Sequence, residues 1–217
     1  MLDDHPPTSP RVIAFDFDGV IADSLDAYFP VFQACCAELG FRGPATLEAF
    51  LDVFDHNAVK GLIRAGVPFY KLKRLGRTLA PRVAALNQEV APFPGIPSLV
   101  QALVTRHPVY VVTSNVTEAT AQFMARHGME GLEDVIGADR EASKIKKLRR
   151  IRKRHRGAEV WYIGDTRGDM VEARRAGTTA VAACWGWHSE ARLSAAKPHY
   201  LVQSPASLGL LLREGGN

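Results

Sequence analysis

The sequence predicts an α/β fold, a doubly wound parallel sheet that carries a small inserted unit of α-helices. Short, unbroken apolar runs alternate along the chain with stretches of helical periodicity, which is typical of βαβ units. Several of these runs end in acidic, hydroxyl or glycine residues, at the position where open α/β sheets place their sites. Between residues 43 and 92 the pattern is helical, without a convincing strand. This stretch predicts the inserted unit.

The first strand is predicted at residues 12–15, which are apolar without alternation, as in a strand buried on both faces. It ends in Asp16 and Asp18, which a period of two points the same way, and Gly19 allows a turn there. Such a pair can hold a hard cation, or divide into nucleophile and general acid/base. The alternative is a simple strand-ending turn, because Asp and Gly are common turn residues.

Helices are predicted to follow the first strand. One covers residues 27–39, and four more helical pieces extend to residue 92, with breaks at 55–57, at 66–68 and at Pro81. The run A-P-F-P-G-I-P at 91–97 marks the return to the sheet, because proline and glycine at this density exclude regular structure. We therefore expect a core of residues 1–23 and 94–217 and a helical cap domain of residues 24–93.

Strands and helices alternate in the second half of the chain. Helices are predicted at 98–106 with Ser98 as N-cap, at 118–127, at 144–156, at 169–176 and after residue 204. Strands are predicted at 109–112, 135–136, 160–163, 179–183 and, weakly, at 200–202. Because parallel strands end at one edge of the sheet, the acids after the first strand should converge with Thr113 and Asp165.

Composition narrows the class of protein. The 217 residues are 47% apolar, enough for a large core. The cysteines, Cys35, Cys36 and Cys184, lack C-x-x-C spacing, which indicates small buried side chains in a reducing compartment. The polar first ten residues do not resemble a signal peptide, and no apolar run approaches the ~20 residues of a membrane span. We expect a cytoplasmic monomer or homodimer without membrane contact.

Much of the net charge of +4 comes from a basic run at residues 144–156. Ile145, Leu148 and Ile151 form a narrow apolar stripe in it, so its lysines and arginines are interpreted as the solvated face of a surface helix. Contact with a nucleic-acid backbone is the alternative, but no aromatic platform accompanies the charge. We therefore expect no nucleic-acid partner.

The predicted strand ends hold the groups that phosphoryl transfer requires. A phosphate carries negative charge, so its transfer needs a metal, a cation, hydrogen-bond donors and an in-line nucleophile. Asp165, with the two acids of the first strand, could supply oxygen ligands for Mg²⁺. Lys144 could supply the cation and Thr113 a hydroxyl donor. Ser114 and Asn115 are interpreted either as phosphate contacts or as turn residues.

With these residues the chain resembles the haloacid dehalogenase (HAD) superfamily of aspartyl phosphatases, close to its phosphoglycolate phosphatase-like branch. The segments D-F-D-G-V-I-A-D-S, V-V-T-S-N, S-K-I-K-K-L and G-D-T-R-G-D-M-V-E-A-R-R-A-G are similar to the family's four motifs, in the right order. The resemblance covers nearly the whole core. It implies a HAD-like Rossmannoid core with a small helical cap that closes over the site and excludes water.

The resemblance also implies residue roles. Asp16 would be the nucleophile that forms an aspartyl-phosphate, and Asp18 the acid/base that protonates the leaving oxygen and then activates water. Thr113 and Lys144 would bind the phosphoryl group. Because the third motif lacks the family's common Lys-Pro pair, Lys146 or Lys147 could replace Lys144. The implied ligands of Mg²⁺ are Asp16, the backbone carbonyl of Asp18, and Asp165, with Asp169 as the second acid of the fourth motif.

The predicted function is Mg²⁺-dependent hydrolysis of a small-molecule phosphate ester. The resemblance first suggests phosphoglycolate, and sugar and nucleotide phosphates stay open. The acid at position 18 favours phosphate over carbon–halogen chemistry, because the family's dehalogenases lack it. A phosphomutase and a weakly catalytic binding or regulatory protein are the alternatives. The cap candidates for reading the substrate are Asp55, His56, Asn57, Lys60, Arg64, Lys71, Arg74 and Arg77, while Trp185, Trp187 and His188 are interpreted as packing residues.

Overall fold

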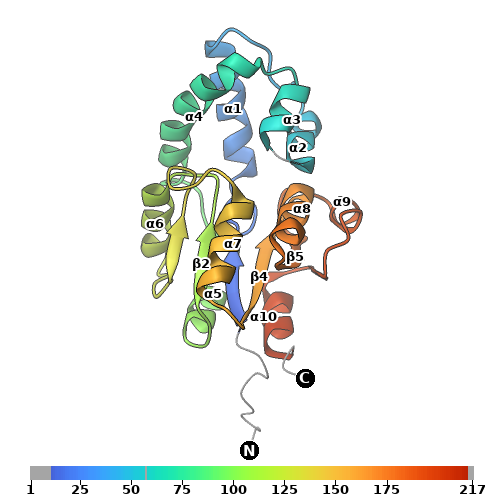
Figure 1. The fold of residues 1–217 in the computed structure, drawn as a ribbon. Coiled ribbons are helices and arrows are strands. Elements are labelled where there is room, and N and C mark those ends of the chain that lie inside the picture. The colour runs from blue at the N-terminus through green and yellow to red at the C-terminus, as the bar shows by residue number, and fades with distance from the viewer. Residues whose placement is uncertain (1–10, 57, 215–217) are drawn as a thin grey trace, which may run out of the picture.

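The computed structural model describes residues 11–56 and 58–214 and confirms the α/β fold. Within these residues, six parallel strands form one sheet in the order β3-β2-β1-β4-β5-β6 (Figure 1). They are β1 (Arg11–Phe15), β2 (Val109–Val112), β3 (Asp134–Ile136), β4 (Glu159–Gly164), β5 (Thr179–Ala183) and β6 (Tyr200–Val202). The strand order reverses between β1 and β4. In doubly wound sheets, ligands bind beyond the carboxyl ends of the strands at such a switch point.

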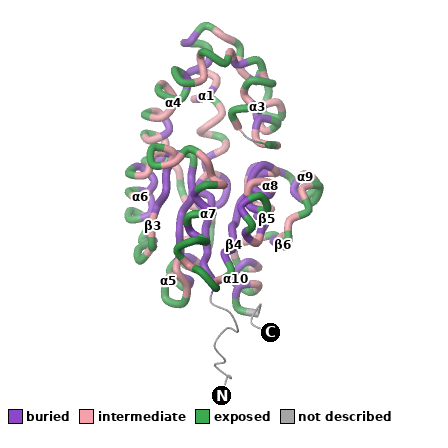
Figure 2. The backbone as a smooth tube through the Cα atoms, in the orientation of Figure 1, coloured by how far each residue is buried: buried purple, intermediate pink, exposed green. Residues whose placement is uncertain are grey.

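Helices cover both faces of the sheet. Alternate residues of β1 point to opposite faces, and both sets are apolar, so each face packs against helices. Ile13 and Phe15 pack with α5 (Ile96–Val104), α6 (Thr117–Arg126) and α10 (Pro205–Glu214). Val12 and Ala14 pack with α7 (Lys144–Arg154), α8 (Arg167–Ala176) and α9 (Glu190–Ser194). The central strands are buried along their length (Figure 2). Burial of a side chain such as Phe15 contributes roughly 1.5–3 kcal/mol, so β1 is held firmly from both sides.

The inserted helices lie together beyond the carboxyl edge of the sheet (Figure 1). They are α1 (Leu25–Glu38), α2 (Leu47–Leu51), α3 (Ala58–Arg64) and α4 (Leu72–Leu86), with the short 3-10 helices η1 (Asp52–Asp55) and η2 (Phe69–Lys71). Phe50 is fully buried among them and packs on Phe32 and Phe54. We call residues 24–93 the cap. Their independence as a domain, with the predicted boundaries, stays a prediction.

Three predictions about helices are wrong. α4 continues through Pro81, where a break is predicted, because packing against α1 outweighs the single backbone hydrogen bond that proline lacks. α5 begins at Ile96 with Gly95, at φ 86°, as its N-cap, so Ser98 lies inside the helix. α9 occupies a part of the tail where no helix is predicted. The other elements of the core, together with α1, lie within two residues of their predicted bounds.

The cysteines and the helices bear on the expected environment of the chain. Cys35 and Cys36 are buried and Cys184 is partly buried, and all three are free thiols. Among the described residues, no helix combines the length and the apolar character that a membrane crossing requires.

Candidate active site

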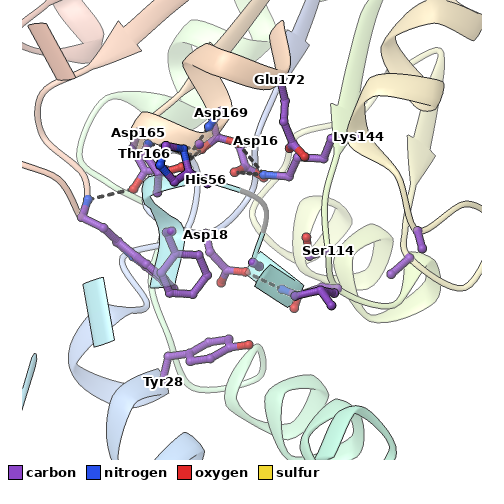
Figure 3. A pocket seen from close by; sticks show the side chains of 18 residues that line it. Asp16, Asp18, Tyr28, His56, Ser114, Lys144, Asp165, Thr166, Asp169 and Glu172 are labelled. Atoms are coloured by element: carbon purple, nitrogen blue, oxygen red, sulfur yellow. Dashed lines mark hydrogen bonds and ion pairs between the residues drawn. The ribbon is translucent and has the colours of Figure 1, made fainter. Parts of the chain in front are cut away.

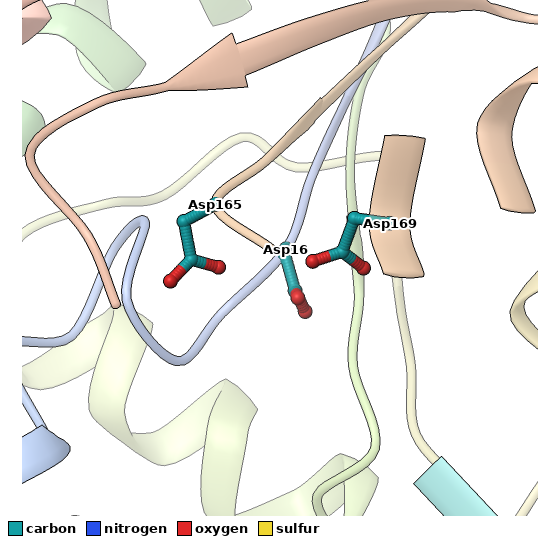
Figure 4. Close-up of side chains that lie close together, drawn as sticks. All are labelled: Asp16, Asp165 and Asp169. Carbon is teal, nitrogen blue, oxygen red and sulfur yellow. The ribbon is translucent and has the colours of Figure 1, made fainter. Parts of the chain in front are cut away.

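Three carboxylates meet at the switch point of the sheet. Asp16 follows β1, Asp165 follows β4 and Asp169 lies in the first turn of α8 (Figure 4). One oxygen of each lies within 4.8 Å of the others, and all three residues are buried. The convergence that the strand ends predict therefore occurs for Asp16 and Asp165. Oxygen donors in this arrangement suit a hard divalent cation.

The hydrogen bonding of Asp165 indicates whether these three carboxylates suit a metal ion. Its Oδ2 accepts a hydrogen bond from the backbone N–H of Trp187 at 2.8 Å, whereas its Oδ1 is buried without a hydrogen-bond partner among the described residues. A buried acceptor without a partner is costly, so this oxygen fits a ligand to a cation. Gly19 allows the close approach of its loop, because a Cβ there would stand 1.8 Å from Asp165 Oδ2. The donor set fits Mg²⁺.

Lys144, the first residue of α7, lies between two of the carboxylates. Its Nζ stands 2.6 Å from Asp16 Oδ2 and 2.6 Å from Asp169 Oδ1 (Figure 3). Ser143 caps the helix by accepting a hydrogen bond from the N–H of Lys146, which sets where the first turn begins. Although burial lowers the pKa of Lys144, the two carboxylates raise it well above its usual value. The lysine is therefore a fixed positive charge beside Asp16.

Burial and charge move the pKa values of the three acids apart. Burial raises the pKa of Asp16 to about 7, against the opposing effect of Lys144. Burial, with the neighbouring charges of Asp169 and Asp16, raises the pKa of Asp165 well above its usual value. The pKa of Asp169 lies below its usual value. Burial acts to raise this pKa, but Lys144 and the hydrogen bonds to the carboxylate outweigh the effect of burial. A bound cation would relieve the repulsion among these acids.

Asp18 is set apart from the three carboxylates. Its Oδ1 accepts a hydrogen bond from Ser24 Oγ at 2.8 Å and its Oδ2 accepts one from Asn115 Nδ2 at 2.9 Å. Burial raises its pKa to about 6, with the hydrogen bonds and Lys144 acting in the opposite direction. The carboxylate is thus held beside the site rather than in the metal cluster. A metal contact through its backbone carbonyl stays a prediction.

The loop after β2 carries the predicted phosphate contacts. Ser114 and Asn115 line the cavity of the site, but Thr113 is fully buried and its Oγ1 accepts a hydrogen bond from the N–H of Asn115. Lys147 donates to the carbonyl of Thr113 at 2.5 Å, so this buried lysine supports the loop. Lys146 has a side chain that is 72% exposed. Of the three candidate lysines, Lys144 is the one placed at the carboxylates.

A cavity of about 260 Å³ opens between the carboxylates and the cap (Figure 3). The core lines it with the acids, Lys144, Thr166, Glu172 and Trp187, and the cap adds Tyr28, Phe54, His56, Ala58 and Val59. Among the described cap residues singled out in the sequence, His56 is the one that lines this cavity. Asn57 lies outside the described residues. Asp55 pairs instead with Arg192, and Lys71 donates to the carbonyl of Leu39.

Comparison with known proteins identifies the family. Residues 13–183 match the model of a family described as "Haloacid dehalogenase-like hydrolase". The chain belongs to this family.

Relatives of the HAD chain include proteins with phosphatase names. A "Phosphoglycolate phosphatase" of Synechococcus elongatus is 28% identical over 202 residues, covering 91% of this chain and 95% of that protein. A "5'-nucleotidase" of Pseudomonas aeruginosa is 28% identical over 219 residues, covering 92% and 94%. A haloacid dehalogenase-like hydrolase of Streptococcus pneumoniae shares the fold at a TM-score of 0.79 and 22% identity, with 94% of this chain and 99% of that chain covered.

Some residues near the site are not predicted from the sequence. Thr166 is one: its side chain and that of the predicted Asp169 form a capping box that starts α8, and the spacing T-x-x-D signals this box in the sequence. Glu172 lies three residues beyond Asp169, a spacing that puts both on one helix face. Tyr162 donates to Asp169 at 3.1 Å from within β4. No local signal distinguishes Tyr28 and Phe54 from ordinary core residues of the cap.

The cap of this HAD chain rests directly on α8 and the loop after β5. His188 accepts a hydrogen bond from the N–H of Arg167 at Nδ1, and its Nε2 lies 3.0 Å from the carbonyl of Leu51. Arg192 reaches Asp52 at 2.5 Å and Asp55 at 2.7 Å. These contacts hold the cap over the cavity.

Proposed function

We propose that the chain is a Mg²⁺-dependent phosphatase that hydrolyses a small-molecule phosphomonoester through an aspartyl-phosphate on Asp16. The observation that carries this proposal is the position of Asp16. Its carboxylate belongs to the three-acid cluster, contacts Lys144 at 2.6 Å and lines a cavity beneath the cap. Metal ligands, a cation and a nucleophile thus face one space, as phosphoryl transfer requires.

Asp16 is oriented by two hydrogen bonds. The backbone N–H of Phe17 donates to Oδ1 at 2.8 Å, and Lys144 donates to Oδ2 at 2.6 Å. Asp16, Asp165 and Asp169 would hold Mg²⁺, which when bound neutralises negative charge on the phosphate oxygens. Lys144 adds a second positive charge at the same point. An anionic nucleophile can then approach an anionic phosphate.

In the first step, an oxygen of Asp16 forms a bond to phosphorus while the bond from phosphorus to the alcohol oxygen breaks. Asp18 gives its proton to that leaving oxygen. In the second step, Asp18 takes a proton from water, the water oxygen bonds to phosphorus, and Asp16 is released with inorganic phosphate. A pKa of about 6 suits both tasks, because both forms of Asp18 are populated near neutral pH.

The family and the names of the relatives support hydrolysis of phosphate esters. Two relatives that match over most of this chain are named a phosphoglycolate phosphatase and a 5'-nucleotidase. Both names describe phosphomonoesterases. We therefore take phosphomonoester hydrolysis as the reaction.

Phosphate release tests this function. The purified protein is assayed on a panel of phosphorylated metabolites and p-nitrophenyl phosphate, with Mg²⁺ and with EDTA. Asp16→Asn is compared with Asp26→Asn, which removes the charge of an exposed acid outside the cavity. We expect EDTA and Asp16→Asn each to abolish release, and Asp26→Asn to retain it. Full activity in Asp16→Asn, or isomerised sugar phosphate in place of free phosphate, would contradict the proposal.

A further inference from the structure

The walls of the catalytic cavity differ in charge. The sheet edge contributes Lys144 and carboxylates, whereas the described cap residues that face them are Tyr28, Phe54, His56, Ala58 and Val59. Trp187 packs edge-on against Tyr28 and Phe54 and extends the aromatic wall. A phosphate at Asp16 would therefore direct its alcohol part toward rings and small apolar side chains.

This wall offers no arginine or lysine to a second anionic group. Among the described lining residues, Lys144 is the one such side chain, and Asp16 and Asp169 already contact it. Arg64, from α3, lines a different cavity.

Glu172 adds negative charge to the same cavity. It lines the space one turn after Asp169 and stands beside Lys144 (Figure 3). The negative charge of Glu172 raises the pKa of Lys144, as do the charges of Asp16 and Asp169. A carboxylate on the alcohol part of a substrate would meet this negative charge, and like charges brought together in a binding site are unfavourable.

The volume limits the size of the alcohol. The cavity of about 260 Å³ lies below the roughly 300–1,000 Å³ typical of sites that enclose drug-sized ligands. Part of this space belongs to the phosphate. The rest suits an alcohol of a few carbon atoms up to about one sugar ring.

We infer that the cavity selects phosphate esters of small, uncharged alcohols over esters that carry a second anionic group. This inference rests on the proposed function and names its substrate class. It departs from phosphoglycolate, the substrate that the resemblance first suggests.

A matched pair of substrates tests the inference. 2-Hydroxyethyl phosphate and 2-phosphoglycolate have the same length and differ in a terminal CH₂OH against a carboxylate. We expect kcat/KM to be about tenfold or more in favour of the uncharged ester, a ratio within reach of pocket discrimination. Equal or higher kcat/KM for 2-phosphoglycolate would overturn the inference.

Two substitutions on α3 test the charge of the wall. Val59 lines the cavity and is 50% exposed, so Val59→Arg places a cation at the cap side. Ile63→Arg adds the same charge to the same helix, at a residue that is 42% exposed and outside the cavity lining. We expect Val59→Arg to shift the substrate ratio about tenfold toward 2-phosphoglycolate, and Ile63→Arg to leave the ratio as in the wild type. An equal shift in both variants would contradict the role of the wall.

p-Nitrophenyl phosphate separates this inference from the proposed function. If it is hydrolysed and neither member of the pair is cleaved, the substrate class is wrong while the phosphatase function stands. If no ester is hydrolysed with Mg²⁺, the proposed function fails and this inference fails with it.

Discussion

Replacing Gly168 with alanine should move the cap away from the sheet edge that carries the candidate active site. Gly168 lies in the first turn of α8, where a Cβ would stand 2.5 Å from the carbonyl oxygen of His56 and 2.6 Å from that of Phe54. Both are backbone atoms, so no side-chain rotation relieves the clash. The cap loop must retreat by at least 0.9 Å, the difference between 2.5 Å and the 3.4 Å at which ordinary contact begins.

The retreat should lower the activity, because Phe54 and His56 line the cavity of the candidate active site. A misplacement of about 1 Å can cost up to about 100-fold in rate, so we expect kcat/KM of Gly168→Ala to fall by about 10- to 100-fold. The helix itself should not suffer, because alanine favours helix over glycine by about 1 kcal/mol. Lower activity should therefore appear without a comparable loss in the free energy of unfolding.

Gly76→Ala is the matched control. Gly76 lies inside α4 of the cap, and an added Cβ meets nothing within 4 Å. This variant should gain about 0.5–1 kcal/mol in the free energy of unfolding and keep its kcat/KM. The assays are phosphate release under initial-rate conditions and urea unfolding followed by circular dichroism. If Gly168→Ala keeps the wild-type kcat/KM, the cap does not depend on this contact and the reasoning is refuted.

Three further predictions concern the lysines, the metal and the cap. Lys144→Met should lower kcat by about 10²- to 10³-fold. Lys146→Met, at an exposed position, should leave kcat unchanged. Lys147→Met should lower the free energy of unfolding by about 1–3 kcal/mol, because the carbonyl of Thr113 loses its buried donor. Equal activity losses in the three variants would contradict this assignment. Burial raises the pKa of Asp16 to about 7, so between about pH 4 and 7 the folded protein without metal binds more protons than the unfolded chain. The contribution of Asp16 to the free energy of unfolding of the protein therefore falls as pH rises through this range. Mg²⁺ needs the deprotonated carboxylate, so the increase in Tm that Mg²⁺ produces should be larger at pH 8 than at pH 6. This increase should be absent in Asp165→Asn. A larger increase at pH 6 than at pH 8 would contradict the prediction. Arg192→Met should lower the free energy of unfolding by about 1 kcal/mol, a value reduced because Asp52 and Asp55 are partly exposed, and should raise KM. Urea unfolding measures the first effect and initial rates measure the second. Wild-type values for both would show that the cap does not need the ion pairs of Arg192.

The sequence by itself determined the sheet and its acids, because both depend on local patterns. β1 and β4 are apolar runs that end in Asp16 and Asp165, and parallel strands place such ends at one edge. The start of α7 at Lys144 was equally predictable. The independence of the cap as a domain and the catalytic roles stay predictions.

Tertiary structure decided which side chains share the cavity. Lys144 and Lys147 lie three residues apart on α7, a spacing at which both face one side of the helix, so the choice between them came from packing: one meets Asp16 and the other meets the carbonyl of Thr113. The aromatic wall joins Tyr28 to Trp187 across 159 positions of the chain. Helical periodicity shows which residues of a helix are buried, but not which partner buries them, because the same amphipathic face can pack in many orientations.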